Sequence, residues 1–151
     1  MSVQTSTQDT QTQSALQSRD RDEDAALVEL FERIASALSS GDAESIAAAW
    51  EAPALVVGDG GIHAVKSSAE VASFFAGARD QYTSRGISAT RAEIARVSWV
   101  GARTAIAEVR WPLLDEKNRE LGEERTTYTL RTGDDGELKI RVAVAHTPVT
   151  H

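Results

Sequence analysis

The helical period in the hydrophobic pattern of this chain ends at about Gly86, and this change limits the fold more than any other feature of the sequence. Up to that point, apart from one short hairpin, apolar residues recur at helical spacing, so that they fall on one face of an amphipathic helix. Beyond it apolar and polar residues alternate, as they do in strands with one buried face. A run of helices followed by a run of strands predicts an α+β domain built on one sheet.

The helical part begins with a long apolar stripe and a sharp corner. The stripe is formed by Leu27, Leu30, Phe31, Ile34 and Leu38. Gly41 then suits the left-handed position that closes a helix, and Asp42 is a preferred N-cap for the next one. The corner therefore predicts a second, short helix, one face of which carries Ile46, Ala49 and Trp50.

A small hairpin and a third helix follow the corner. Residues 55–57 and 62–65 are strand-like and flank the turn sequence GDGG. Ser67 and Glu70 have the spacing of a capping box, which predicts the start of a helix. The helical stripe behind them consists of Val71, Phe74, Phe75, Ala78 and Tyr82.

The part after Gly86 contains four strand-like segments joined by short polar connectors. Such connectors predict an antiparallel meander, and alternation predicts which side chains share a face. The expected sets are Ala105, Ala107, Val109 and Trp111; Tyr128 and Leu130; and Leu138, Ile140, Val142, Val144 and His146. The third set would point His146 toward the helices. Residues 115–124, DEKNRELGEE, are expected to form a solvated hairpin tip.

Composition excludes several classes of function. The formal net charge of −7 argues against nucleic acid and against an anionic membrane surface as partners. No apolar run reaches the roughly 20 residues that a membrane span needs. The chain has no cysteine, which removes disulfides, thiolate nucleophiles and cysteine-bound zinc. Three scattered histidines predict no metal site, and no motif predicts a cofactor.

The first residues have a different composition from the rest. Residues 1–21 are rich in Gln, Thr and Ser, so we expect a disordered tail followed by one domain over residues 22–151. The tail has neither the basic start nor the apolar run of a secretory signal, and a cytoplasmic protein is expected.

Three motifs resemble those of the nuclear transport factor 2-like superfamily, particularly its SnoaL-like and ketosteroid-isomerase-like branch. They are SSGDAESIAAAWEAPALVV, SSAEVASFF, and YTLRTGDDGELKI with AHT behind it, and the similarity covers about residues 24–147. The resemblance implies three N-terminal helices packed in the concave face of a strongly curved, mainly antiparallel sheet. It also implies a cone-shaped pocket with the short helix folded over its open end, and dimers through the sheet.

The resemblance also suggests candidate catalytic residues. In ketosteroid isomerases one carboxylate lies near the end of the first strand, and a second acid lies on the strand before the final turn. Read across without gaps, these positions fall on Gly58 and Tyr128, and Asp59 is displaced by one residue, which turns a strand side chain to the opposite face. The candidates are Tyr128 as hydrogen-bond donor and His146 or Asp59 as base. Each also has a purely structural interpretation.

Three functions remain open. The first is a pocket protein that binds or transforms a small, apolar, oxygen-bearing compound, with a lining drawn from Phe31, Trp50, Phe75, Trp111, Tyr128 and His146. The second is a non-catalytic dimeric interaction module whose cone is filled by its own side chains. The third is an isomerase, cyclase or hydrolase that uses a pocket acid or base. The sequence leaves open whether the protein is an enzyme. An unfilled, partly polar cavity would favour the first and third functions.

Polar side chains gather on the opposite face of the meander. Glu108 and Arg110 lie two residues apart on one strand, where they are able to pair, and Arg125, Thr127 and Thr129 follow on the next strand. A face of mixed polar and paired charged residues suits pairing with a second copy of the chain. We therefore expect a homodimer through this outer face.

Overall fold

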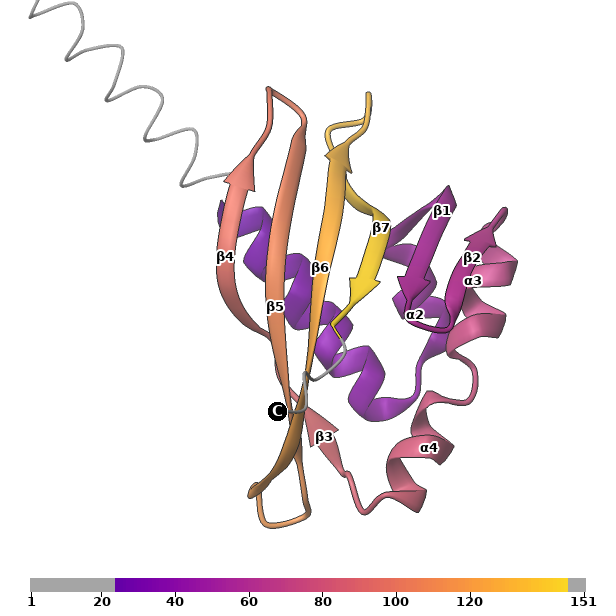
Figure 1. The fold of residues 1–151 in the computed structure, drawn as a ribbon, viewed down its shortest axis with the longest axis vertical. Helices are drawn as coiled ribbons and strands as arrows, with labels where there is room; N and C mark the ends of the chain where they lie inside the picture. The colour runs from indigo at the N-terminus through magenta and orange to yellow at the C-terminus, as the bar shows by residue number, and fades with distance from the viewer. Residues whose placement is uncertain (1–23, 147–151) are drawn as a thin grey trace, which may run out of the picture.

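The structure, a computed structural model, describes residues 24–146 (Figure 1). The tail expected over residues 1–21 lies outside the described residues. One long helix, residues 24–40, crosses the concave face of a curled sheet, and the remaining helices lie beside it (Figure 1). The expected α+β architecture, with N-terminal helices held by a curved sheet, is confirmed.

Within the described residues, the long helix is followed by α2 (Ala43–Ala48), α3 (Ser68–Phe75) and α4 (Ala78–Ser84). The long helix buries the stripe that its sequence predicts, because Leu27, Leu30, Phe31 and Ile34 are almost completely inaccessible. None of the helices in residues 24–146 has the length and apolar character to cross a membrane.

The corner between the long helix and α2 has the expected geometry. Gly41 has a φ of 75°, and the Asp42 N–H donates to the Ala37 carbonyl over 2.9 Å, which is the hydrogen bond of a Schellman motif. The Asp42 carboxylate accepts from the Ser45 hydroxyl at 2.6 Å and the Ser45 N–H at 3.1 Å, and these bonds lower the pKa of Asp42. The short helix ends at Ala48, so Trp50 begins a strand and is not the last residue of a helical face.

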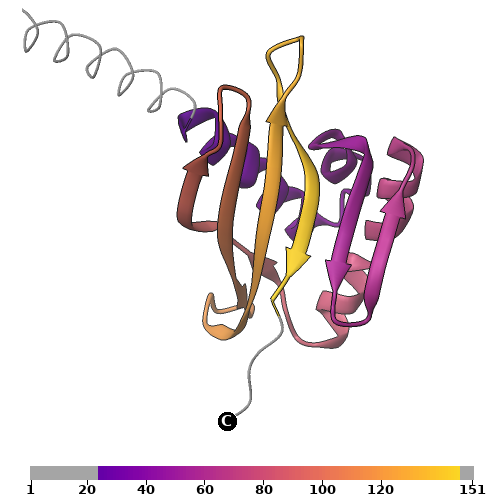
Figure 2. The same cartoon turned by 45° about the horizontal axis from the view of Figure 1, so that its top comes forward.

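Over residues 24–146 the sheet has seven strands: β1 (Trp50–Gly58), β2 (Gly61–Val65), β3 (Ala89–Thr90), β4 (Glu93–Trp99), β5 (Thr104–Leu114), β6 (Glu120–Thr132) and β7 (Leu138–Ala145). Their order is β2-β1-β7-β6-β5-β3, and β4 also pairs with β5. Strands β4 to β7 form the expected antiparallel meander, whereas β1 joins β7 in parallel. Figure 2 shows the β1–β2 hairpin extending the sheet beyond β7, with helices behind it.

The predicted third helix is divided in two. Its start is as expected, because the Ser67 hydroxyl accepts from the Glu70 N–H at 3.2 Å. However, α3 ends at Phe75 and α4 begins at Ala78, with Gly77 as its N-cap. A glycine inside a helix costs about 1 kcal/mol relative to alanine, which makes this position a weak point in the stripe. The break places Tyr82 on a separate helix from Phe75.

The inner face of β5 is as predicted, but that of β7 is not. Ala105, Ala107 and Val109 are completely buried. On β7, the register runs from Leu130↔Ile140 to Thr129↔Val142, which leaves Arg141 as one extra residue in a β-bulge. The bulge reverses the alternation beyond it. Ala143 therefore faces inward opposite Tyr128, and the expectation that Val142, Val144 and His146 share the inward face with Ile140 is wrong.

Candidate functional site

A pocket of about 270 Å³ lies between the helices and the inner face of β5, β6 and β7. We call it the cone pocket. Its lining combines apolar side chains with a few polar groups, as in most small-molecule sites. The lining residues are Leu38, Trp50, Val56, Phe74, Phe75, Tyr82, Trp111, Glu124, Thr126, Tyr128, Ala143 and Ala145.

Strand β6 gives the cone pocket a row of polar side chains. Glu124, Thr126 and Tyr128 are two residues apart, so they project from the same face of the strand. Their burial increases along the row: the Glu124 side chain is 52% exposed, whereas Tyr128 is only 8% exposed. The row therefore runs from the mouth of the pocket to its buried end.

The Tyr128 hydroxyl is held in place at the buried end. The Trp111 indole N–H donates to the Tyr128 hydroxyl oxygen over 3.2 Å. The Phe31 ring packs against both side chains, with centroid distances of 4.9 Å to Tyr128 and 6.1 Å to Trp111. Because the Tyr128 oxygen accepts from Trp111, the phenol proton remains available to a different acceptor.

Both pocket tyrosines are protonated at neutral pH. Burial raises the pKa of Tyr128 far above its ordinary value, and hydrogen bonds with Trp111 and Thr126 oppose this effect only in part. Burial, assisted by the negative charge of Glu124, raises the pKa of Tyr82 to about 12. A tyrosine with a raised pKa is a hydrogen-bond donor and not a base at neutral pH.

The mouth of the cone pocket carries one ion pair. Glu124 Oε1 lies 3.4 Å from Nη1 of Arg85, the residue that caps the C-terminus of α4. Both side chains are about half exposed, so solvent screens the pair. Among the described residues that line the pocket, Glu124 is the single residue with a formal charge.

The opposite wall of the cone pocket is a cluster of aromatic rings. The Trp50 ring packs on Phe75 at a centroid distance of 5.9 Å, and Phe75 meets Phe74 at 5.0 Å. Phe74 is 47% exposed and stacks on His63 at 5.5 Å, so it forms part of the rim. These contacts join α3 to the first two strands beside the pocket.

The structure brings four of the six predicted lining residues together. Trp50, Phe75, Trp111 and Tyr128 line the cone pocket, and the fully buried Phe31 supports two of them. His146 lies on the outer face of the sheet. Its Nε2 is 2.6 Å from the Thr127 hydroxyl, and its Nδ1 is 3.9 Å from Glu108 Oε1.

The remaining catalytic candidate, Asp59, is exposed in the turn between β1 and β2. The catalytic roles suggested for Tyr128, His146 and Asp59 stay predictions. Of these three residues, Tyr128 lines the cone pocket and the other two do not.

Sequence reasoning missed Glu124, Thr126 and Tyr82. Residues 115–124 were expected to form a hairpin tip, but β6 already begins at Glu120. The signal that finds Glu124 and Thr126 is the alternation itself, counted backwards from Tyr128 in steps of two. The sequence predicts Tyr82 on the stripe of the third helix, whereas the structure places it on α4, where it lines the cone pocket.

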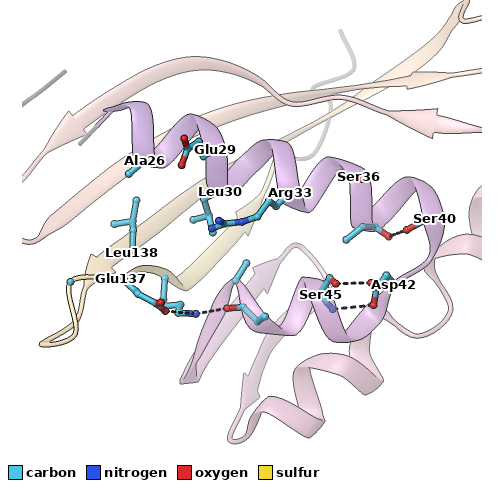
Figure 3. A pocket seen from close by; sticks show the side chains of 15 residues that line it. Ala26, Glu29, Leu30, Arg33, Ser36, Ser40, Asp42, Ser45, Glu137 and Leu138 are labelled. Carbon is cyan, nitrogen blue, oxygen red and sulfur yellow. Dashed lines mark hydrogen bonds and ion pairs between the residues drawn. The ribbon is translucent and has the colours of Figure 1, made fainter. Parts of the chain in front are cut away.

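A larger cavity, of about 620 Å³, lies on the other side of the long helix. It runs between the long helix, α2 and the start of β7, with Ala26 and Leu138 at one end and Ser40 and Asp42 at the other (Figure 3). Its lining is rich in serine and charged residues and contains no aromatic ring among the described residues. The cone pocket has the composition of a ligand site, and this larger cavity does not.

Metal ligation has no support within residues 24–146, where no three His, Asp or Glu side chains form a group that could hold an ion.

Comparison with known proteins identifies the fold. Residues 22–148 match the model of a family described as NTF2-like protein (DUF6841). No curated protein matches the chain. Among solved structures, a domain of unknown function with a cystatin-like fold from Nostoc punctiforme is 21% identical with a TM-score of 0.69, and the match covers 84% of this chain and 78% of that chain.

Two further structures agree with this fold. An NTF2-like protein with a cystatin-like fold from Novosphingobium aromaticivorans is 18% identical with a TM-score of 0.66, covering 89% of this chain and 87% of that one. An NTF2-like protein of unknown function from Shewanella oneidensis is 14% identical with a TM-score of 0.63, covering 82% and 98%. At these identities the similarity shows the fold alone.

Proposed function

Because the chain belongs to the NTF2-like family whose model spans residues 22–148, we propose that it binds a small, apolar, oxygen-bearing molecule in the cone pocket. One observation carries the proposal: an oriented tyrosine hydroxyl lies at the buried end of an aromatic-lined cavity of about 270 Å³. A pocket with few, well-placed polar groups is the usual form of a small-molecule site.

The lining assigns different parts of the ligand to different residues. The rings of Trp50, Phe75 and Trp111 would bury an apolar body, which is favourable by about 25 cal/mol for each Å² removed from water. Tyr128 would donate a hydrogen bond to a ligand oxygen. Its oxygen already accepts from Trp111, and its raised pKa keeps the phenol protonated. The hydroxyl would thus fix the orientation of the ligand.

The alternative of a non-catalytic module with a filled cone is less well supported. It requires that the chain's own side chains occupy the cone, whereas about 270 Å³ remains free beside Tyr128.

The experiment is a thermal-shift screen of small apolar compounds against the full chain and two variants of β7. Ala143→Leu places three extra carbon atoms in the cone pocket, because Ala143 faces inward and lines it. Val142→Leu is the matched control, since its neighbour in the register is Thr129 on the outer face. A ligand bound only by the folded state at about 100 times its Kd stabilises that state by about 2.7 kcal/mol.

We expect hits that raise the melting temperature of the wild type and of Val142→Leu but not that of Ala143→Leu. Tyr128→Phe should retain the fold and weaken each oxygen-bearing hit by roughly tenfold, which corresponds to one hydrogen bond of about 1–1.5 kcal/mol. Absence of any hit, or hits that ignore Ala143→Leu, would contradict the proposal.

A further inference from the structure

Resting on the proposed function, we propose that the ligand of the cone pocket carries a cationic amine, which the Glu124 carboxylate binds at the mouth while the aromatic rings enclose the apolar body. Three observations support it: the position of Glu124, the number of aromatic faces around it, and the weakness of its present ion pair.

Glu124 is directed into the pocket by the register of the sheet. It pairs with Trp111 across β5 and β6, and it shares the inner face with Thr126 and Tyr128. Its neighbour Glu123 faces the other way and binds Arg110 and Arg125 on the outer face. Of these two consecutive residues, Glu123 therefore forms ion pairs on the outer face, and Glu124 lines the pocket.

Aromatic side chains supply the rest of an amine site. Six of the lining residues are aromatic: Trp50, Phe74, Phe75, Tyr82, Trp111 and Tyr128. Aromatic faces carry partial negative charge and attract ammonium groups within about 6 Å of the ring centroid. Burial is the main cause of the raised pKa of Tyr82 and of Tyr128, and the charge of Glu124 adds to both shifts, so the carboxylate lies near both rings.

The lining discriminates among ligand charges. A carboxylate and aromatic faces both repel an anionic ligand, and both attract a cation. The net charge of −7 adds a long-range field that favours the approach of cations over anions. A neutral alcohol would gain only a hydrogen bond at Glu124.

Arg85 does not block this use of Glu124. The two side chains are 3.4 Å apart and about half exposed, and exposed pairs of this kind are screened by solvent and stabilise only weakly. A ligand amine would replace one counter-ion of Glu124 by another. If Glu124 served only to link α4 to β6 through Arg85, its removal would leave ligand selectivity unchanged.

Titration calorimetry on the full chain tests the inference with three probes that share a phenol. Tyramine carries an amine, tyrosol carries a hydroxyl in its place, and 4-hydroxyphenylacetate carries a carboxylate. We expect tyramine to bind about tenfold more tightly than tyrosol, as one partly desolvated cation contact implies. The carboxylate should bind more weakly than either. Glu124→Gln should abolish the preference for tyramine while leaving tyrosol binding unchanged.

Two further variants serve as controls. Glu123→Gln removes the same charge on the outer face and should preserve the preference, and Arg85→Gln should preserve or increase it. Equal affinities for tyramine and tyrosol, a preference that survives Glu124→Gln, or no binding by any probe would overturn the amine assignment. The proposal of a ligand pocket is judged separately, because it depends on whether screen hits distinguish Ala143→Leu from Val142→Leu.

Discussion

Strands β5 and β6 present two different surfaces made from alternate residues of the same chain segments. On the inner face, Glu124, Thr126 and Tyr128 border a cavity, and the Tyr128 hydroxyl accepts a hydrogen bond from the Trp111 indole N–H. On the outer face, Arg110 binds three glutamates, with distances of 3.0 Å to Glu93, 2.5 Å to Glu120 and 2.6 Å to Glu123.

The difference lies in how polar groups are satisfied. Outside, each charge of the Arg110 cluster already has opposite charges within ion-pair distance, and the Arg110 side chain is 22% exposed. Inside, Glu124 has one half-exposed ion-pair partner, Arg85, and Thr126 and Tyr128 line a cavity bordered by aromatic rings. A surface whose charges satisfy one another suits stability or assembly, whereas groups left facing a cavity suit a ligand. Because successive side chains of a strand point to opposite faces, the same two strands provide both surfaces.

The largest expected effect is on the inner face. Phe31→Ala removes a fully buried ring that packs on Trp111 and Tyr128, and it should cost about 3–5 kcal/mol of unfolding free energy. Ile62→Ala on β2, where Ile62 is 71% exposed, should cost far less. Urea denaturation of both variants measures the difference. Similar losses would mean that the Phe31 ring does not pack in the core as described.

The outer face of the sheet is the surface through which we propose that the chain forms a homodimer. A row across this face joins Leu55, Val142, Thr129 and Ile106 by strand pairing. The triple variant Arg110→Glu, Thr127→Arg and Thr129→Arg should disfavour the dimer by placing like charges against each other. Light scattering at micromolar concentration reads the outcome. A wild-type monomer, or a dimer indifferent to the triple variant, would place the interface elsewhere.

The third prediction concerns the pH dependence of the outer cluster. Hydrogen bonds from Arg91 and then Arg110 lower the pKa of Glu93 below its ordinary value of 4.5. A carboxyl with a lowered pKa contributes stability above its unfolded-state pKa, and this contribution is lost as the pH falls through the folded-state pKa. Arg110→Met should therefore flatten the acid side of the stability curve below about pH 4.5. An unchanged acid limb in urea melts would contradict the assignment.

The smallest effect is spectroscopic and belongs to the inner face. The chain has two tyrosines, and both line the cone pocket. Burial raises the pKa of Tyr82 to about 12 and that of Tyr128 further. A group with a raised pKa contributes stability below its unfolded-state pKa that is lost as the pH rises through the folded-state pKa. Ultraviolet titration of the folded chain should show little tyrosinate at pH 10, the ordinary value. Half-ionisation near pH 10 would mean an open, hydrated pocket.

The sequence predicts most of the fold because local chemistry fixes it. Gly41 and Asp42 define a corner through backbone conformation and capping, and the alternation of residues 105–111 follows from one buried face. These features depend on residues that are close together in the sequence. They are therefore predictable from the sequence without knowledge of which strands pair.

The candidate site is harder to predict because it depends on pairing. The extra residue at Arg141 has no local signature, since a bulge is set by the partner strand, and it alone decides that His146 faces outward. The pocket position of Glu124 is not predictable from the sequence for a similar reason, because the length of β6 is determined by its pairing with β5. Trp111 and Tyr128 were found because they lie far from both irregularities.

Methyl NMR on the full chain, titrated with a hit from the screen, tests the central claim that the inner face of β6 and β7 holds a ligand. The probes are alternate methyl groups of the same two strands: Thr126 and Ala143 line the cone pocket, whereas Thr127 and Val142 face outward. Binding in the pocket should shift the signals of Thr126 and Ala143 and leave those of Thr127 and Val142 nearly unchanged. Larger shifts at Thr127 and Val142 would show that the ligand occupies the outer face and would contradict the account.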